Sequence, residues 1–105
     1  MAFIDEGERC AAMLKDPSKQ VMLMGNHGVM VLGSSVADAF NRLFYFERSA
    51  ETYIRALQTS MELNFLSNEV AEKTAKQWES YQGTADLHFD ELKSILDNHE
   101  ADYKL

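Results

Sequence analysis

The chain has 105 residues, a hydrophobic fraction of 46% and a formal net charge of −7. The hydrophobic fraction is too high for a disordered chain, and the length suits one domain. The acidic balance disfavours nucleic acid and anionic membranes as partners. A single cysteine, Cys10, excludes an internal disulfide, and no apolar run reaches the length of a transmembrane helix. We therefore expect a cytoplasmic protein.

The first expected element is a short helix from Ile4 to Lys15. Asp5 is the expected cap of this helix, because Glu8 follows it at the spacing of a capping box. The run Asp16-Pro17-Ser18 then predicts a turn, since proline fixes its own φ and disfavours the helical conformation in the residue before it.

A hairpin is predicted next, from two apolar segments, Val21–Met24 and Val29–Leu32, joined by Gly25-Asn26-His27-Gly28. Segments this short and uncharged are typical of strands buried on both faces. Asn and Gly tolerate positive φ, so the four joining residues can form a tight turn. Such a turn presents the His27 imidazole at its tip, as a metal ligand, a proton carrier or an ordinary hydrogen-bonding group.

The longest expected helix begins after Ser35, which has the spacing of a capping box with Asp38. Acidic residues precede basic ones by four positions in Asp38–Arg42 and Glu51–Arg55, a pattern that supports a solvated helix face. The aromatic residues cover more than one face, which favours burial in the core plus one interface over burial in the core alone. The apolar residues at steps of three and four are Val36, Phe40, Leu43, Phe44, Ala50, Tyr53, Ile54 and Leu57.

Two further helices are expected after an apolar connector, Met61 to Leu66, that should pack back onto the core. Ser67 is the expected cap of the first, Gly83 its expected end, and Thr84 the expected cap of the second. The expected buried stripe of the first is Val70, Ala71, Thr74, Ala75 and Trp78.

His88 and His99 lie on or beside the apolar stripe of the last helix, and we interpret both as surface or boundary residues. Their spacing does not suit a helical metal site, which prefers ligands four residues apart. Residues 102–105 should fray unless they dock. The fold class is therefore α/β: a short helix, an antiparallel β-hairpin and three helices.

The chain also resembles a known family, through the string MGNHGVMVLGSSVADAFNRLFYFERSAETYIRAL. This string is similar to the C-terminal part of the class II aldolase and adducin head-domain family. The specific parts are the NHG turn, the GVMVLG strand and the helix opening SSVADAF. The resemblance runs from about Val21 through the long helix, and more loosely to the end. It implies that residues 1–105 form one partial domain, the C-terminal part of a three-layer α/β/α fold.

In this family the HG turn carries the last histidine ligand of a divalent metal, usually zinc. The resemblance therefore implies that His27 is a metal ligand. The family's other ligands, a His-x-His pair preceded by an acidic base, have no counterpart here, and the catalytic residues stay unassigned. We expect this chain alone to bind zinc weakly or not at all and to lack the family's lyase activity on carbonyl substrates of the sugar-phosphate type.

Two hypotheses follow from the resemblance. The chain is a C-terminal fragment of a class II aldolase-like lyase that acts on a small-molecule substrate, or it is a non-catalytic packing and oligomerisation module of the adducin kind. Because sites in this family lie between subunits, both predict a homo-oligomer or a complex with a missing N-terminal half-domain.

Overall fold

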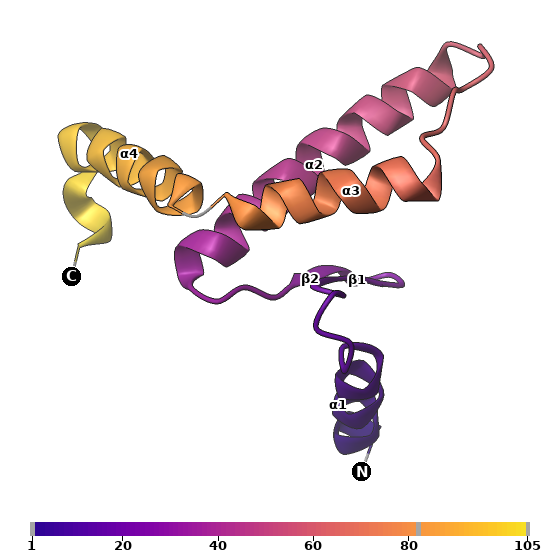
Figure 1. Ribbon diagram of the computed structural model, residues 1–105. Coiled ribbons are helices and arrows are strands. Elements are labelled where there is room, and N and C mark those ends of the chain that lie inside the picture. Colours follow the sequence, from indigo (N-terminus) through magenta and orange to yellow (C-terminus); the bar gives the residue numbers. More distant parts are fainter. Residues whose placement is uncertain (1, 82, 105) are drawn as a thin grey trace.

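A computed structural model describes residues 2–81 and 83–104 and confirms the expected order of a short helix, a hairpin and three helices (Figure 1). None of the described helices has both the length and the apolar character needed to span a membrane. The elements are α1 (Ala2–Met13), β1 (Val21–Met24), β2 (Gly28–Val31), α2 (Val36–Gln58), α3 (Asn68–Ser80), α4 (Thr84–His99) and a 3-10 turn (Ala101–Tyr103).

The two strands form an antiparallel sheet in which Val21 pairs with Val31 and Met24 with Gly28. The expectation that both strands are buried on both faces is wrong. Met22 is the one buried residue of the two strands, and its neighbours are half-buried or exposed. The physical reason is that a two-stranded ribbon offers little area of its own, so its faces stay exposed wherever no second layer covers them.

The start of α2 follows the sequence prediction closely. Ser35 has an extended backbone, and its Oγ accepts a hydrogen bond of 3.1 Å from the Asp38 N–H. Both expected ion pairs form, Arg42 with Asp38 at 3.2 Å and Arg55 with Glu51 at 2.6 Å. These interactions depend only on residues three or four positions apart, which is why the sequence predicts them.

Two expected caps are wrong. The helix α1 begins at Ala2, so Asp5 lies inside its first turn and does not cap it. Its carboxylate still stabilises the helix, because it lies near the positive end of the helix dipole. Thr84 is already helical in α4, and the residue before that helix is Gly83, with a φ of 87°. Gly83 does not end α3 as expected, because α3 ends at Ser80. The other two local predictions are confirmed: Ser67 caps α3 through the Val70 N–H, and the Asp16 carboxylate accepts the Ser18 N–H in the turn.

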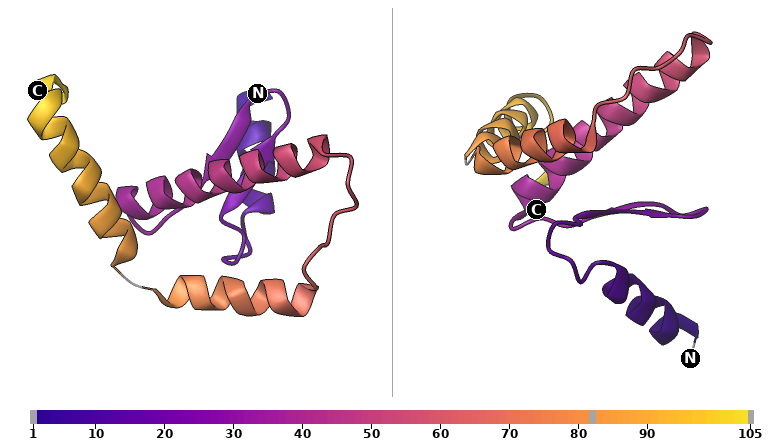
Figure 2. Two further views of the ribbon diagram at one scale, coloured as in Figure 1. Left: turned by 90° about the horizontal axis from the view of Figure 1, so that it is seen from above. Right: turned by 45° about the vertical axis from the view of Figure 1, so that its right-hand side comes forward.

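The elements are arranged openly, with α2 at the centre and α4 crossing its first half (Figure 2). Met22 and Ala37, 7% and 8% exposed, are the only buried apolar residues among those that the structure describes. The radius of gyration is 17.2 Å, against about 13 Å for a compact domain of this length. The described chain therefore lacks a core of ordinary size.

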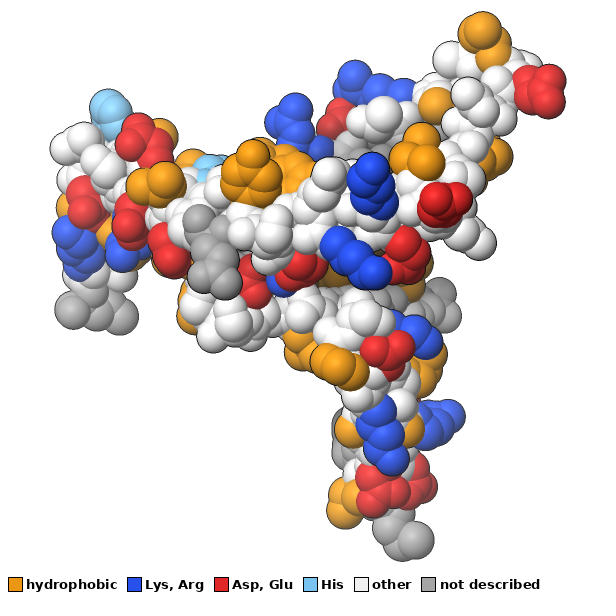
Figure 3. Space-filling model, viewed as in Figure 1, with side chains coloured by type: hydrophobic (Ala, Val, Ile, Leu, Met, Phe, Trp, Pro, Cys, Tyr) orange, Lys and Arg blue, Asp and Glu red, His pale blue; other side chains and the backbone are white. Residues whose placement is uncertain are grey.

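The expected burial of α3 and of the connector is wrong for the same reason. All five residues of the α3 stripe are exposed, as are Met61, Phe65 and Leu66 of the connector. Figure 3 shows apolar side chains at the surface along this part of the molecule. Helical periodicity identified the apolar face of α3, but nothing in the described chain covers that face.

The C-terminal segment docks on α4. Asp97 accepts a hydrogen bond from the Tyr103 hydroxyl and pairs with Lys104 at 2.8 Å. Hydrogen bonds from Lys104 and Tyr103 lower the pKa of Asp97. The expected fraying of residues 102–104 is thus replaced by docking, and Leu105 lies outside the described residues.

Candidate metal site at the hairpin turn

His27 lies at the tip of the hairpin, in the tight turn that the sequence predicts. The His27 N–H donates a hydrogen bond of 3.1 Å to the Met24 carbonyl, which closes the turn. Asn26 has a φ of 65° and Gly28 a φ of 113°. Asparagine is among the few residues that adopt the first value readily, and the second favours glycine, so the Asn-His-Gly order matches the backbone that holds the histidine.

The side chain of His27 is exposed. The turn between β1 and β2, to which it belongs, lies at the end of the hairpin away from the start of α2 (Figure 1). An exposed imidazole at a rigid turn can donate one ring nitrogen to a metal without disturbing the fold. A catalytic zinc usually takes three protein ligands, however. Within residues 2–81 and 83–104, no group of three or more His, Cys, Asp or Glu side chains could hold a metal ion. The described residues therefore do not build a complete metal site around His27.

The other two histidines lie on α4, which contacts neither strand in the described structure. His88 is half-buried: its Nδ1 is 3.1 Å from Asn41 Oδ1, and its ring packs edge-on against Phe44 at a centroid distance of 4.7 Å. His99 is exposed at the end of α4. These positions agree with the boundary and surface locations expected from the sequence, and they leave His27 as the one histidine in the hairpin.

A polar network that the sequence did not predict links α2 to α3. The Arg42 guanidinium binds both carboxylate oxygens of Glu79, at 2.6 and 2.8 Å, and also contacts Asp38. Asp38 accepts the Ser34 N–H at 2.9 Å as well. Glu79 lies 37 residues from Arg42, so no helical spacing indicates the pair. The one hint is chemical: a half-buried arginine can bind a second carboxylate in addition to Asp38.

The carboxylates of this network are held in their ionised form. Hydrogen bonds from Arg42 lower the pKa of Glu79. Burial opposes ionisation of Asp38, but hydrogen bonds from the Ser34 N–H and from Arg42 outweigh it and lower the pKa of Asp38. Hydrogen bonds to Glu79 and Asp38 raise the pKa of Arg42. Arg42, Asp38 and Glu79 help to line a cavity between α2 and α3. Because two carboxylates already satisfy the guanidinium, this cavity is poorly suited to binding a phosphate group.

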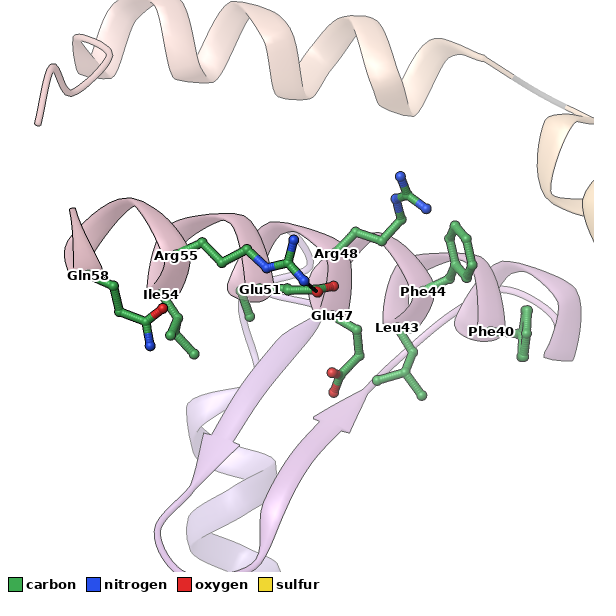
Figure 4. A pocket seen from close by; sticks show the side chains of 10 residues that line it. Phe40, Leu43, Phe44, Glu47, Arg48, Glu51, Ile54, Arg55 and Gln58 are labelled. Atoms are coloured by element: carbon green, nitrogen blue, oxygen red, sulfur yellow. Dashed lines mark ion pairs between the residues drawn. The ribbon is translucent and has the colours of Figure 1, made fainter.

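A shallow groove follows one side of α2, and Figure 4 shows the side chains that line it. Its apolar residues include Phe40, Leu43 and Ile54. Of its four charged residues, Glu51 and Arg55 pair with each other. No polar side chains converge there on a single point, as they do in sites for small polar substrates. The groove has the character of a packing surface.

A comparison with protein-family models gives a match that includes the hairpin. Residues 1–54 match the family model described as Class II Aldolase and Adducin N-terminal domain. The matched segment contains α1, the His27 hairpin and most of α2. No curated protein and no solved structure gives a match. The family match covers half of the chain, and the chain therefore belongs to the class II aldolase and adducin N-terminal domain family.

Proposed function

We propose that this chain supplies one metal ligand, His27, to the divalent-metal site of a class II aldolase-like lyase. The metal is zinc or another divalent ion, and the substrate is a carbonyl compound of the sugar-phosphate type. The observation that carries the proposal is the position of His27: it is exposed in the tight turn of the hairpin, inside the segment that matches the family.

The remaining ligands and the acidic base come from another polypeptide in this proposal. One imidazole is too few for tight binding of zinc, and the described residues offer no second cluster of ligands near it. Residues 1–105 then act as one partial domain whose metal site is completed by an N-terminal half-domain. A second copy of this chain would bring another His27 but no His-x-His pair. The isolated chain orients His27 through its turn and performs no chemistry alone.

A second candidate function is a non-catalytic packing and oligomerisation module of the adducin kind. It is favoured by the exposure of large apolar side chains on α2, α3 and the connector. Exposed apolar area on this scale marks an interaction surface. Both candidates place the protein in the cytoplasm and predict self-association.

An aldol-cleavage assay with a panel of sugar phosphates and added zinc tests the first proposal. We expect no turnover above the buffer rate from the isolated chain, and the same result for His27→Ala. His99→Ala is the matched control, because it removes another exposed histidine. Zinc-dependent cleavage by the wild type that is lost in His27→Ala and kept in His99→Ala would show a complete enzyme and contradict the proposal.

A further inference from the structure

One stripe of α2 has the spacing of a coiled-coil seam. Its seven members recur at alternating steps of four and three residues, and six of the seven are apolar. This heptad pattern lets two helices pack along their whole length with the side chains interdigitated. The stripe consists of Val36, Phe40, Leu43, Glu47, Ala50, Ile54 and Leu57.

Much of this α2 stripe is uncovered. Val36, Ile54 and Leu57 are 74%, 55% and 51% exposed. Figure 4 shows Leu43, Glu47 and Ile54 projecting from the same side of the helix. At the start of the stripe, the Phe40 ring packs on Phe89 of α4 at a centroid distance of 5.5 Å.

The exposed area of the molecule is large enough for an obligate interface. The accessible surface is 9301 Å², whereas a compact monomer of this mass exposes about 6,000 Å². The excess is about 3,300 Å², and an obligate dimer buries about 1,000–2,500 Å² on each chain. The molecule as a whole therefore exposes more surface than a compact monomer, and the α2 stripe contributes to this excess.

We propose that the α2 stripe is covered by the α2 stripe of a second copy of this chain, antiparallel across a two-fold axis. This deepens the self-association proposed above. In this register Leu43 faces Ile54 of the second copy, and Phe40 faces its Leu57. Glu47 faces the small Ala50, and each of these contacts occurs twice because the interface is isologous.

The charge of Glu47 decides the direction of the helices. A parallel pair in register would place the two Glu47 carboxylates in one layer, where like charges repel and no cation of the stripe compensates them. The antiparallel register puts each Glu47 against a methyl group, so its aliphatic stem packs and its carboxylate reaches solvent. The stripe is thus complementary to itself only in the antiparallel direction.

Sedimentation of the wild type, Ile54→Glu and Thr52→Glu tests the surface. Thr52 is the matched control: it is an exposed residue of the same helix, two positions away and so on the opposite side. We expect a wild-type dimer, an increase of at least about 100-fold in the dissociation constant for Ile54→Glu, and little change for Thr52→Glu. A monomeric wild type at about 100 μM would overturn the proposal. Equal effects of the two substitutions would overturn it too.

Disulfide trapping tests the direction, with Leu43→Cys and Ile54→Cys prepared separately in a Cys10→Ser background. The antiparallel register joins the two variants when they are mixed. When one variant pairs with itself, the cysteines of the two copies are offset by eleven residues in this register. That offset is about 16 Å along the helix axis, which is too far for a disulfide. Cross-linking of either variant with itself, or none in the mixture, contradicts this register. The aldol-cleavage assay tests the role of His27, and the cross-linking tests the α2 stripe. A failure of the proposed function can therefore be distinguished from a failure of the proposed dimer.

Discussion

Gly33 shows how a single residue fixes the position of the candidate ligand. It connects β2 to α2, and a Cβ added to it would meet the backbone of Ala39, with the Ala39 Cα only 2.8 Å away. The absence of a side chain lets the segment after β2 pass close to the first turns of α2. Since the hairpin leaves α2 from this point, Gly33 sets where His27 lies relative to the rest of the molecule.

Gly33→Ala should therefore lower the free energy of unfolding by about 1–3 kcal/mol, because the added methyl group forces backbone atoms apart. Gly25→Ala is the matched control, since its added Cβ meets nothing within 4 Å. Urea unfolding followed by circular dichroism measures both. Equal midpoints for the two variants would show that the close contact at Gly33 does not constrain the fold.

At the scale of elements, α3 is attached to α2 near its C-terminal end, where Trp78 and Glu79 lie. Near that end the Tyr45 and Trp78 rings pack at a centroid distance of 5.0 Å, beside the Arg42–Glu79 ion pair. The connector between the two helices is largely exposed. A partly exposed bidentate pair of this kind contributes about 1 kcal/mol. The attachment of α3 should therefore be sensitive to the charge of Glu79.

We expect α3 to detach in acid. The pKa values of Glu79 and Asp38 are lowered in the folded state, so the detached state binds more protons near pH 4. The stabilisation is complete above the unperturbed pKa of about 4 and is lost as the pH falls through the lowered values. Fluorescence of Trp78, the only tryptophan, follows the change.

Glu79→Gln should show the detached emission of Trp78 already at neutral pH. The control is Glu72→Gln, which removes an exposed carboxylate from the same helix. An emission spectrum of Glu79→Gln identical to that of the wild type from neutral pH down to pH 3 would contradict the assigned role of the ion pair.

The elements also show which parts of the fold a sequence can predict. The Ser35 cap, the Asp38–Arg42 pair and the turn at Asn26 depend on neighbours within four residues, and all were predicted. The Glu79 partner of Arg42 and the exposure of the α3 stripe were not. Hydrophobic periodicity identifies which face of a helix is apolar, but it carries no information on what covers that face.

The same distinction applies to the candidate site. The sequence predicted the tight turn that carries His27, because asparagine and glycine have distinctive backbone preferences. It could not predict how far the strands are buried, since burial depends on the layer packed against them. Whether His27 binds a metal stays a prediction, because ligand groups from distant segments converge only through the tertiary fold.

At the scale of the whole molecule, the described chain has the secondary structure of a domain without the buried core of one. Its large apolar side chains lie at the surface, and its candidate ligand lies at the free end of a hairpin. Both features point to missing partners in our account: a second copy covers the α2 stripe, and a polypeptide that carries the other ligands completes the site at His27.

Calorimetric titration of zinc into the purified chain, into His27→Ala and into His99→Ala tests this most directly. All three should fold alike, because both histidines are exposed. We predict weak, non-stoichiometric binding by the wild type and by His99→Ala, and weaker binding by His27→Ala. Tight one-to-one binding that is lost in His27→Ala would contradict the account, because the chain would then hold a complete site. Weak binding that is unchanged in His27→Ala would contradict the assignment of His27 as a ligand.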